Sequence, residues 1–457
     1  MGKWTKVGAV ILVAAAGGAV AAPLVTGNMA EQRMHAFAQN PVLLQSPNLK
    51  WVVTRYESDY LGATAVSELT FRHPELEESF TLVLDHDIDH ALAAGNSLLR
   101  IRTTPRIPEG RAQQVAQRLF DERSPLTVDY RMRLDGTSVA QIQSPPTDGM
   151  RELDYGAVEW KGLNGEVSVT PGGDGEYRLQ VPGLRFEPNS GEIESMAVGA
   201  IRGQGNFATT EFDGIWTGAG TSSIASMRMG GAPEGDLSID GIEFSQETSL
   251  QQGLVATRLD GRIARAVAPE NEITDVRMKF SANRLAPELL QALQTFSSES
   301  AAAESEAQRQ RIARQVIGRV PWGEVARGEP LITLDLQGSA GQGAVSASGK
   351  LGLNAPAPEQ AAQMQMFDLA GFAHAEVSLR APEAVVVDAF AQRAQAEASD
   401  LSDAEARSSA RDQVRGLQSQ GWIQADGNEL FATAGYDRGQ IRINGRGLLG
   451  MSMGLGN

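Results

Sequence analysis

Short runs in which apolar and polar residues alternate, separated by glycine-containing turns, recur along most of this chain of 457 residues. Phe80, Leu82 and Leu84 would share one face of a strand, and segments 50–56 and 64–71 show the same period of two less regularly. This period is typical of strands whose two faces differ in polarity. Turn residues at intervals of roughly 8 to 12 positions favour antiparallel strands over alternating strand–helix–strand units.

Turn signals place further strands along the chain. Segment 126–134 ends at Asp135-Gly136, a dipeptide typical of a hairpin. Other turns are expected at Gly172-Gly173, Asp213-Gly214 and Asp240-Gly241. Later strands are expected at 331–336 and 344–353, which turn at Gly338 to Gly343, and at 430–436 and 440–444. Residues 447–457 are expected to form a frayed tail rich in glycine and methionine.

Two stretches predict helices inserted into this β pattern, near 287–320 and 382–419, and each begins with a proline that suits the first helical turn. Residues 297–310 lack apolar side chains larger than alanine, so this part is expected to be exposed or to form a loop between two helices. In the second stretch, residues 399–403 indicate a break followed by a new helix cap.

The N-terminus carries the strongest signal for cellular location. Lys3 and Lys6 precede an uncharged stretch, 7–29, which would rise about 34 Å as a helix and so cross a bilayer of ~30 Å. Three interpretations remain open: a retained anchor, a signal peptide cleaved after Ala19-Val20-Ala21, and a buried helix. We predict an anchor or signal-anchor at 1–29.

The positive residues before the apolar stretch predict that the bulk of the chain faces the periplasm. A short helix at 30–40 would lead into a β-rich periplasmic domain that spans 30–457. The expected location is therefore the inner membrane, crossed by a single segment.

Composition excludes several classes of function. The chain has no cysteine, so disulfides and thiol chemistry are excluded. Its 40 basic and 56 acidic residues give a formal charge of −16, which argues against nucleic acid as a partner, because phosphate binding needs a concentrated basic surface.

One segment, Asp85–His90, gathers side chains able to bind a metal or to transfer protons. On a strand its three aspartates would share one face, while Ile88 and the two histidines would share the other. The alternative is a solvated strand end. The other histidines, His35, His73 and His374, are scattered.

Several other motifs have structural explanations. Gly338-Ser339-Ala340-Gly341 lacks the pattern of a serine nucleophile elbow and is expected to be a hairpin turn. Gly203-Gln204-Gly205 and Gly218-Ala219-Gly220 do not open a helix, so they are not phosphate loops. Trp160, Trp216 and Trp322 are expected in the core or at an interface, with ligand binding the alternative, and the charged helix at 304–314 is expected to be a solvated face or a partner site.

Landmarks in a consistent order resemble one known family. They are Thr26-Gly27 with Glu31, Tyr60-Leu61-Gly62, Asp89-His90, Leu134-Asp135-Gly136, Trp160 to Gly165, Gly328 to Thr333, and Tyr436 to Gly445. Together they resemble the YdgA/YihF-type family of anchored periplasmic proteins of Gram-negative bacteria, a domain of unknown function. The resemblance implies a retained anchor, a periplasmic body and self-association, and supplies no activity and no catalytic residues. Ala91-Leu92-Ala93 replaces the Gly-Pro-Phe that usually follows the Asp-His pair.

We therefore expect a mainly β (α+β) protein: an N-terminal transmembrane helix, then an extended, twisted antiparallel sheet with two helical insertions. We assign no catalytic, cofactor-binding or metal-binding residue. The first functional hypothesis is a non-enzymatic envelope scaffold or interaction protein, whose partners would be a second copy or other envelope proteins. The alternatives are a lipid-binding or lipid-transfer module with a β-sheet groove, and a metal-dependent hydrolase. The same alternation builds either a closed core or an open groove.

Overall fold

The computed structural model describes residues 49–58, 62–72, 79–90, 97–107, 109–191, 193–231, 235–269, 271–301, 303, 305–341, 343–397 and 401–447. The predicted anchor at 1–29, the predicted helix at 30–40 and nearly all of the predicted tail lie outside these residues. Among the helices within the described ranges, none combines the length and the apolar content needed to cross a bilayer.

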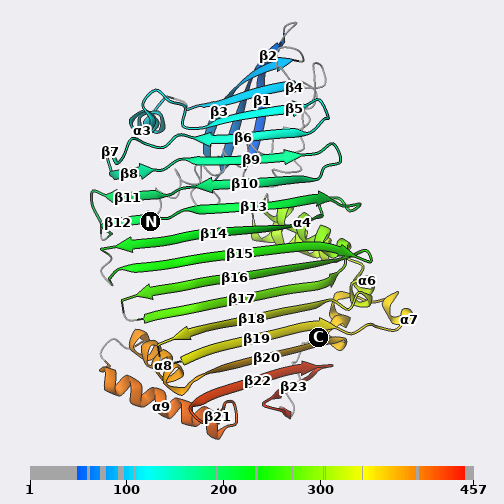
Figure 1. The fold of residues 1–457 in the computed structure, drawn as a ribbon. Helices are drawn as coiled ribbons and strands as arrows, with labels where there is room; N and C mark the ends of the chain where they lie inside the picture. The colour runs from blue at the N-terminus through cyan, green and yellow to red at the C-terminus, as the bar shows by residue number, and fades with distance from the viewer. Residues whose placement is uncertain are drawn as a thin grey trace. The chain divides into compact units, whose positions relative to one another are not determined.

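The chain divides into two compact units, Met1–Gly235 with Gln291–Gly318, and Asp236–Leu290 with Arg319–Asn457. Both units are mainly β and their strands pair antiparallel, as the alternating pattern predicts (Figure 1).

The first unit contains strands β1 to β14. They are β1 (Leu49–Ser58), β2 (Gly62–Arg72), β3 (Ser79–His90), β4 (Ser97–Arg106), β5 (Thr127–Arg133), β6 (Ser138–Ser144), β7 (Arg151–Leu153), β8 (Gly156–Trp160), β9 (Leu163–Val169), β10 (Gly175–Val181), β11 (Leu184–Pro188), β12 (Ser195–Val198), β13 (Ile201–Thr209) and β14 (Trp216–Gly230).

Two rows of paired strands make up this sheet. The longer row runs β1-β2-β3-β4-β5-β6-β9-β10-β13-β14. The shorter row runs β7-β8-β11-β12 and also ends on β14. The chain passes from one row to the other three times, at Gly162 between β8 and β9, at Gly183 between β10 and β11, and at Gly199 between β12 and β13. Gly162 and Gly183 have positive φ angles of 92° and 156°, which glycine adopts without the strain of a side chain.

Two hydrophobic clusters hold the first unit together. One gathers Trp51, Leu82, Trp160 and neighbours under helix α3 (Arg111–Phe120), which adds Leu119 and Phe120. The other lies on β1 to β6 around Ile88, Leu99 and Tyr130. Both draw on alternate strand residues, so the period of two predicts which side chains are buried.

The second unit contains the remaining strands. They are β15 (Leu237–Gln251), β16 (Leu254–Ala268), β17 (Asn271–Leu285), β18 (Leu331–Ala340), β19 (Gly343–Leu353), β20 (Ala373–Pro382), β21 (Gln424–Asp426), β22 (Glu429–Asp437), β23 (Gln440–Ile443) and β24 (Arg446–Gly447). They pair in the order β15-β16-β17-β18-β19-β20-β22. The far edge of β22 pairs with β21 along its first half and with β23 along its second, and β24 follows β23.

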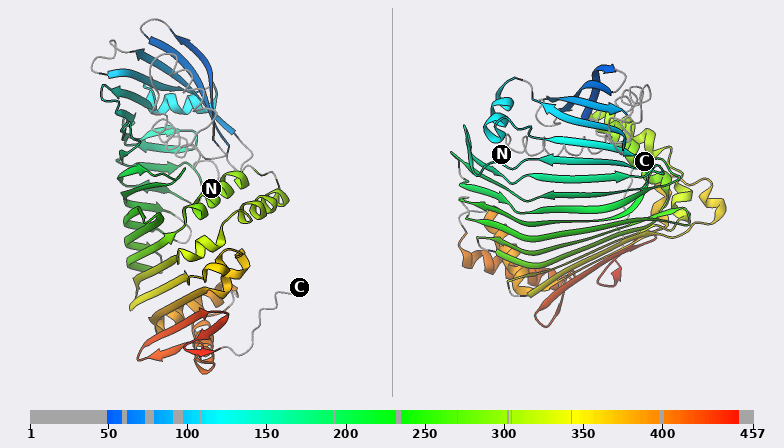
Figure 2. Two further views of the ribbon diagram at one scale, coloured as in Figure 1. Left: turned by 90° about the vertical axis from the view of Figure 1, so that its right-hand side faces the viewer. Right: turned by 45° about the horizontal axis from the view of Figure 1, so that its top comes forward.

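Helices complete both units. They are α4 (Pro287–Ala301), α5 (Glu306–Ile317), α6 (Trp322–Arg327), α7 (Pro358–Ala361), the 3-10 helix η2 (Met366–Gly371), α8 (Glu383–Glu397) and α9 (Asp403–Ser419). Figure 2 shows α6 and α7 at one end of the second unit's strands and α8 with α9 at the other. The pair α8 and α9 packs around Val387, Ala410 and Val414 against Leu430 of β22, which forms that unit's hydrophobic cluster.

The two helical insertions are confirmed, including the predicted break before α9, where Ser402 is the cap. The exposed stretch inside 297–310 is also confirmed, because α4 ends at Ala301 and Glu306 to Arg311 are solvent-exposed. The prediction of a turn at Asp240-Gly241 is wrong. This dipeptide lies inside β15, where Gly241 has φ 64° and interrupts the pairing with β16 as a local irregularity instead of a chain reversal.

Candidate functional site

The Asp85–His90 segment forms the second half of β3, and its side chains divide between the two faces as the alternation predicts. His86 and Ile88 are buried, whereas Asp85 and Asp89 are partly exposed and Asp87 is exposed. The aspartates and His86 therefore point to opposite sides of the sheet. Within the described ranges no group of three or more His, Asp or Glu side chains is arranged to hold a metal ion.

His86 links three neighbouring strands from inside the first unit. Its Nε2 atom lies 2.7 Å from the Ser67 hydroxyl of β2, and its Nδ1 atom lies 2.9 Å from the Thr103 hydroxyl of β4. The Trp51 ring lies 6.5 Å away. Burial lowers the pKa of His86 from 6.5 to about 4, against the opposing effect of the Asp85 carboxylate. At neutral pH the ring is uncharged and hydrogen-bonded on both nitrogens, which is a structural role.

The outer face of β3 to β5 is a network of opposite charges. Arg106 binds Asp85 through two hydrogen bonds, and Asp129 accepts hydrogen bonds from Arg100 and Arg131. Burial raises the pKa of Asp129, but hydrogen bonds from the two arginines outweigh it and leave that pKa below its ordinary value. A hollow of about 420 Å³ on this face is lined by arginines together with aspartates, so the positive and negative charges of its lining largely cancel.

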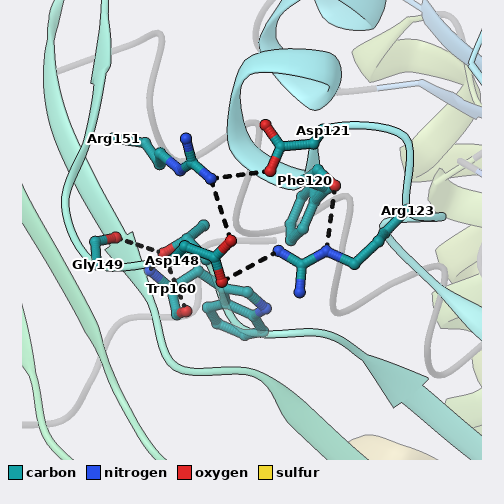
Figure 3. Close-up of polar contacts among 8 residues, drawn as sticks. Phe120, Asp121, Arg123, Asp148, Gly149, Arg151 and Trp160 are labelled. Carbon is teal, nitrogen blue, oxygen red and sulfur yellow. Dashed lines mark hydrogen bonds and ion pairs between the residues drawn. The ribbon is translucent and has the colours of Figure 1, made fainter.

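A second polar cluster lies where α3 ends (Figure 3). Arg151 of β7 donates to Asp121, directly after α3, at 2.8 Å and to Asp148 at 3.3 Å. Arg123 pairs with the same Asp148 at 3.6 Å and donates to the Phe120 carbonyl at 3.3 Å. These contacts connect the end of α3 to the loop before β7. The cluster therefore holds the helix over the core instead of presenting free groups to a substrate.

The core beneath this cluster contains the first predicted tryptophan. Trp160 is buried, and its Nε1 donates to the Ser144 hydroxyl at 2.9 Å. The hydroxyl of Thr147 accepts from the Trp160 backbone N–H at 3.0 Å, so this residue is anchored at two points. Trp216 is half-buried, with its ring edge-on to Phe207. Trp322 begins α6 and is also half-buried.

The glycine motifs lie within strands. Gly205 of β13 pairs with Gly220 of β14, and the Tyr177 ring of β10 lies over both. A Cβ at Gly205 would approach the Ala219 carbonyl oxygen to 2.6 Å, so the glycine permits close packing. Ser339 still belongs to β18, and the chain turns only after Ala340, later than the predicted start at Gly338. His374 is far along the chain in β20, whereas His35 and His73 lie outside the described ranges.

The second unit carries a surface that these motifs do not mark. Pairing from β18 to β22 brings apolar side chains into register across one face: Leu334 opposite Gly349, Gly349 opposite Val377, and Val377 opposite Ala434. We call this surface the apolar face. On β18 to β22 it consists of Ile332, Leu334, Leu336, Ala347, Gly349, Leu351, Ala375, Val377, Leu379, Leu430, Ala432, Ala434 and Tyr436. The Tyr436 hydroxyl donates to the Ala370 carbonyl of η2.

The apolar face is open to solvent over β19 and β20, whereas Leu430 of the same face on β22 is buried under α8 and α9. Leu379 is 53% exposed, Leu351 49% and Val377 48%. The same face continues on β15 to β17, where Phe244 and Met278 lie against Gly261. On the described residues of β18 to β20, this face carries no charged side chain.

Charge is confined to the opposite face of the same strands. Asp335, Lys350 and Glu376 alternate with the apolar residues and point the other way. Hydroxyl pairs join neighbouring strands there, with 2.8 Å between the Ser348 and Ser378 oxygens. The sheet is therefore strongly two-sided. An apolar molecule can contact one face of such a sheet while the charged side chains of the other face stay hydrated.

The sequence contains the signal for this surface. Three strands in succession place every charge at one parity and, apart from Leu331 at the start of β18, every large apolar residue at the other. The alternation predicts the two faces, but it does not show which part of the apolar one stays exposed in the described residues. That fact depends on the tertiary arrangement.

A family model described as "Bacterial protein of unknown function (DUF945)" matches residues 1–448, and the chain belongs to this family. No curated protein matches the chain. No solved structure matches it either.

Proposed function

We propose that this member of the DUF945 family is a non-enzymatic binding protein of the cell envelope, and that its binding surface is the apolar face of the second unit. The supporting observation is the exposure of Leu351, Val377 and Leu379 on an uncharged sheet surface. Leaving apolar surface in water costs about 25 cal/mol per Å². A contiguous exposed surface of this kind is characteristic of interaction sites.

The polar clusters support a binding role over catalysis. His86 is hydrogen-bonded on both ring nitrogens inside the core, and Arg151 connects α3 to the sheet. Both clusters stabilise the first unit. A general acid or base must instead reach a substrate proton from an accessible position.

In this proposal residues 1–29 tether the protein to the inner membrane and the two units lie in the periplasm. Support comes from Lys3 and Lys6 ahead of the uncharged stretch 7–29.

Charge inserted into the apolar face tests the binding role. In the full-length protein, Val377→Glu places a carboxylate among apolar neighbours, and we expect about tenfold weaker binding of an environment-sensitive hydrophobic fluorophore. Ser346→Glu is the matched control, because Ser346 lies on the opposite face, paired in register with Arg380. Equal binding by the wild type and both variants would contradict the proposal.

A further inference from the structure

We infer that three methionines of the first unit form a binding site for Cu(I), a soft monovalent cation. The ligands are the thioether sulfurs of Met196 on β12 and of Met227 and Met229 on β14. We call this the methionine site. It is separate from the apolar face of the second unit, so it adds a function that does not depend on that face.

Strand pairing places the three side chains on one face of the sheet. Met196 and Met229 are directly paired where β12 lies beside β14, and Met227 is two positions before Met229 (Figure 1). Directly paired side chains have Cβ atoms about 4.5–5.5 Å apart, and residues two positions apart on one strand are separated by about 7 Å. A methionine side chain has three rotatable bonds, so the three sulfur atoms can converge on one ion.

Packing does not explain methionine at these positions. Met196 is 45% exposed and Met227 is 39% exposed, so neither fills a gap in a core. On the same face Leu184 and Phe186 of β11 pair with β12 and pack against the core under α3. The methionines lie beyond them, at positions where a strand favours β-branched and aromatic side chains. Their sulfur atoms therefore suggest a role in ligand binding.

The donor atoms select the class of ion. Thioether sulfur is a soft, uncharged ligand that suits Cu(I), whereas Zn²⁺ and Mg²⁺ sites use imidazole, thiolate or oxygen ligands. The neighbours in register with the methionines on β11 and β12 are Leu184, Phe186 and Val198, which cannot bind a metal. The chain has no cysteine, so thioethers are the softest donors that it can offer.

A carboxylate beside the site supplies negative charge. Glu194 precedes Met196 by two positions, and its N–H donates to the Gly230 carbonyl, which extends the pairing of β12 with β14. Its side chain lies against Gly231. No basic side chain within the described ranges forms an ion pair with Glu194. Three uncharged thioethers cannot balance the charge of a bound cation, and a carboxylate about 7 Å from Met196 favours one.

The size of the methionine site argues against a protein partner. The site offers three side chains, whereas a stable protein interface uses about 20 to 30 residues on each side. Three converging donors instead match the needs of a single ion.

Titration of the full-length protein with Cu(I) tests the methionine site. A coloured Cu(I) chelator supplies the metal without oxygen, and its loss of colour measures transfer to the protein. We expect one Cu(I) per chain, with sulfur ligands in the X-ray absorption spectrum. Met196→Leu, Met227→Leu and Met229→Leu should each weaken binding by about tenfold, because each removes one sulfur and keeps the apolar volume.

Met150→Leu is the matched control. Met150 is 37% exposed and precedes β7, three strands from β12 in the shorter row, so this variant should bind Cu(I) as the wild type does. Unchanged binding by the three site variants, an equal loss in Met150→Leu, or a metal bound only by nitrogen and oxygen would each overturn the methionine site.

The methionine site and the apolar face should fail independently. Val377→Glu should weaken binding of the hydrophobic fluorophore and leave Cu(I) binding unchanged, whereas Met229→Leu should do the reverse. Loss of Cu(I) binding in Val377→Glu would overturn the methionine site, because the metal would then depend on the second unit.

Discussion

Strands β2 to β4 of the first unit and β18 to β20 of the second follow the same alternating pattern, with opposite outcomes for their apolar side chains. Leu82, Ile88 and Leu99 are buried in two clusters, one of them covered by α3. Val377 and Leu379 remain about half exposed. In the second unit the helices α8 and α9 pack around Leu430 instead. Alternation therefore specifies which side chains share a face, and a covering element decides whether that face becomes a core or a binding surface.

The largest expected effect is loss of a buried aromatic ring from the first unit. Phe120 is 2% exposed at the end of α3. Phe120→Ala should lower the free energy of unfolding by about 3–5 kcal/mol, because it removes buried surface and leaves a cavity. Leu379→Ala in the second unit should cost less than about 1 kcal/mol. Chemical denaturation of both variants checks the comparison, and similar losses would show that the apolar face is packed.

Acid should weaken the first unit through His86. Its pKa is about 4 when folded and 6.5 as a free side chain, so between these values the unfolded chain binds a proton that the folded chain does not. Its contribution to stability is present above pH 6.5 and falls by about 3 kcal/mol as the pH drops to about 4.

Denaturation of the wild type and of His86→Asn across this pH range measures the effect. The wild type should lose more stability on acidification than the variant, which has no titrating ring. Parallel curves would mean that water reaches His86.

Two glycines sharpen the contrast between closed and open surfaces. Gly205→Ala in the first unit would bring a methyl group to 2.8 Å from the Tyr177 ring and 2.6 Å from a carbonyl oxygen, costing about 1–3 kcal/mol. Gly349→Ala in the second unit meets open space and should stabilise by about 0.4–1 kcal/mol through the unfolded chain. Melting temperatures of the two variants should shift in opposite directions. A destabilised Gly349→Ala would mean that the position is already filled.

A small and local effect concerns the packed end of the second unit. Ser402 accepts from the Glu405 backbone N–H at 3.4 Å, and the Glu405 carboxylate accepts from the Ser402 N–H at 3.1 Å. Ser402→Ala should cost about 1 kcal/mol by removing this cap of α9. Amide hydrogen exchange should become faster in α9 and stay unchanged in β18 to β20. If exchange became equally faster in α9 and in β18 to β20, the strands of the apolar face would depend on the helix pair for their stability, which would contradict the account.

Local chemistry explains which features were predictable from sequence. The strands near 80, 331 and 344 and both helical insertions follow from period and capping, which act over a few residues. Helix α3 was missed, although Val115, Leu119 and Phe120 have helical spacing. The turn at Asp240-Gly241 failed because the dipeptide also serves as an irregularity inside a long strand.

The candidate site was predictable only in part. The facing of Asp85 and His86 followed from the alternation, and the two-sided polarity of β18 to β20 was readable in the same way. Whether a helix or another sheet covers a given face depends on contacts between distant segments, which alternation alone does not encode.

Thiol labelling tests the central claim most directly, because the chain has no cysteine of its own. Single variants Val377→Cys on the apolar face and Val128→Cys in the first unit's core would be reacted with a maleimide in the folded full-length protein. The account predicts rapid labelling at position 377, close to that of unfolded chain, and strong protection at position 128, where the native valine is 5% exposed. Equal protection at the two positions would contradict an open apolar face and, with it, the proposed binding surface.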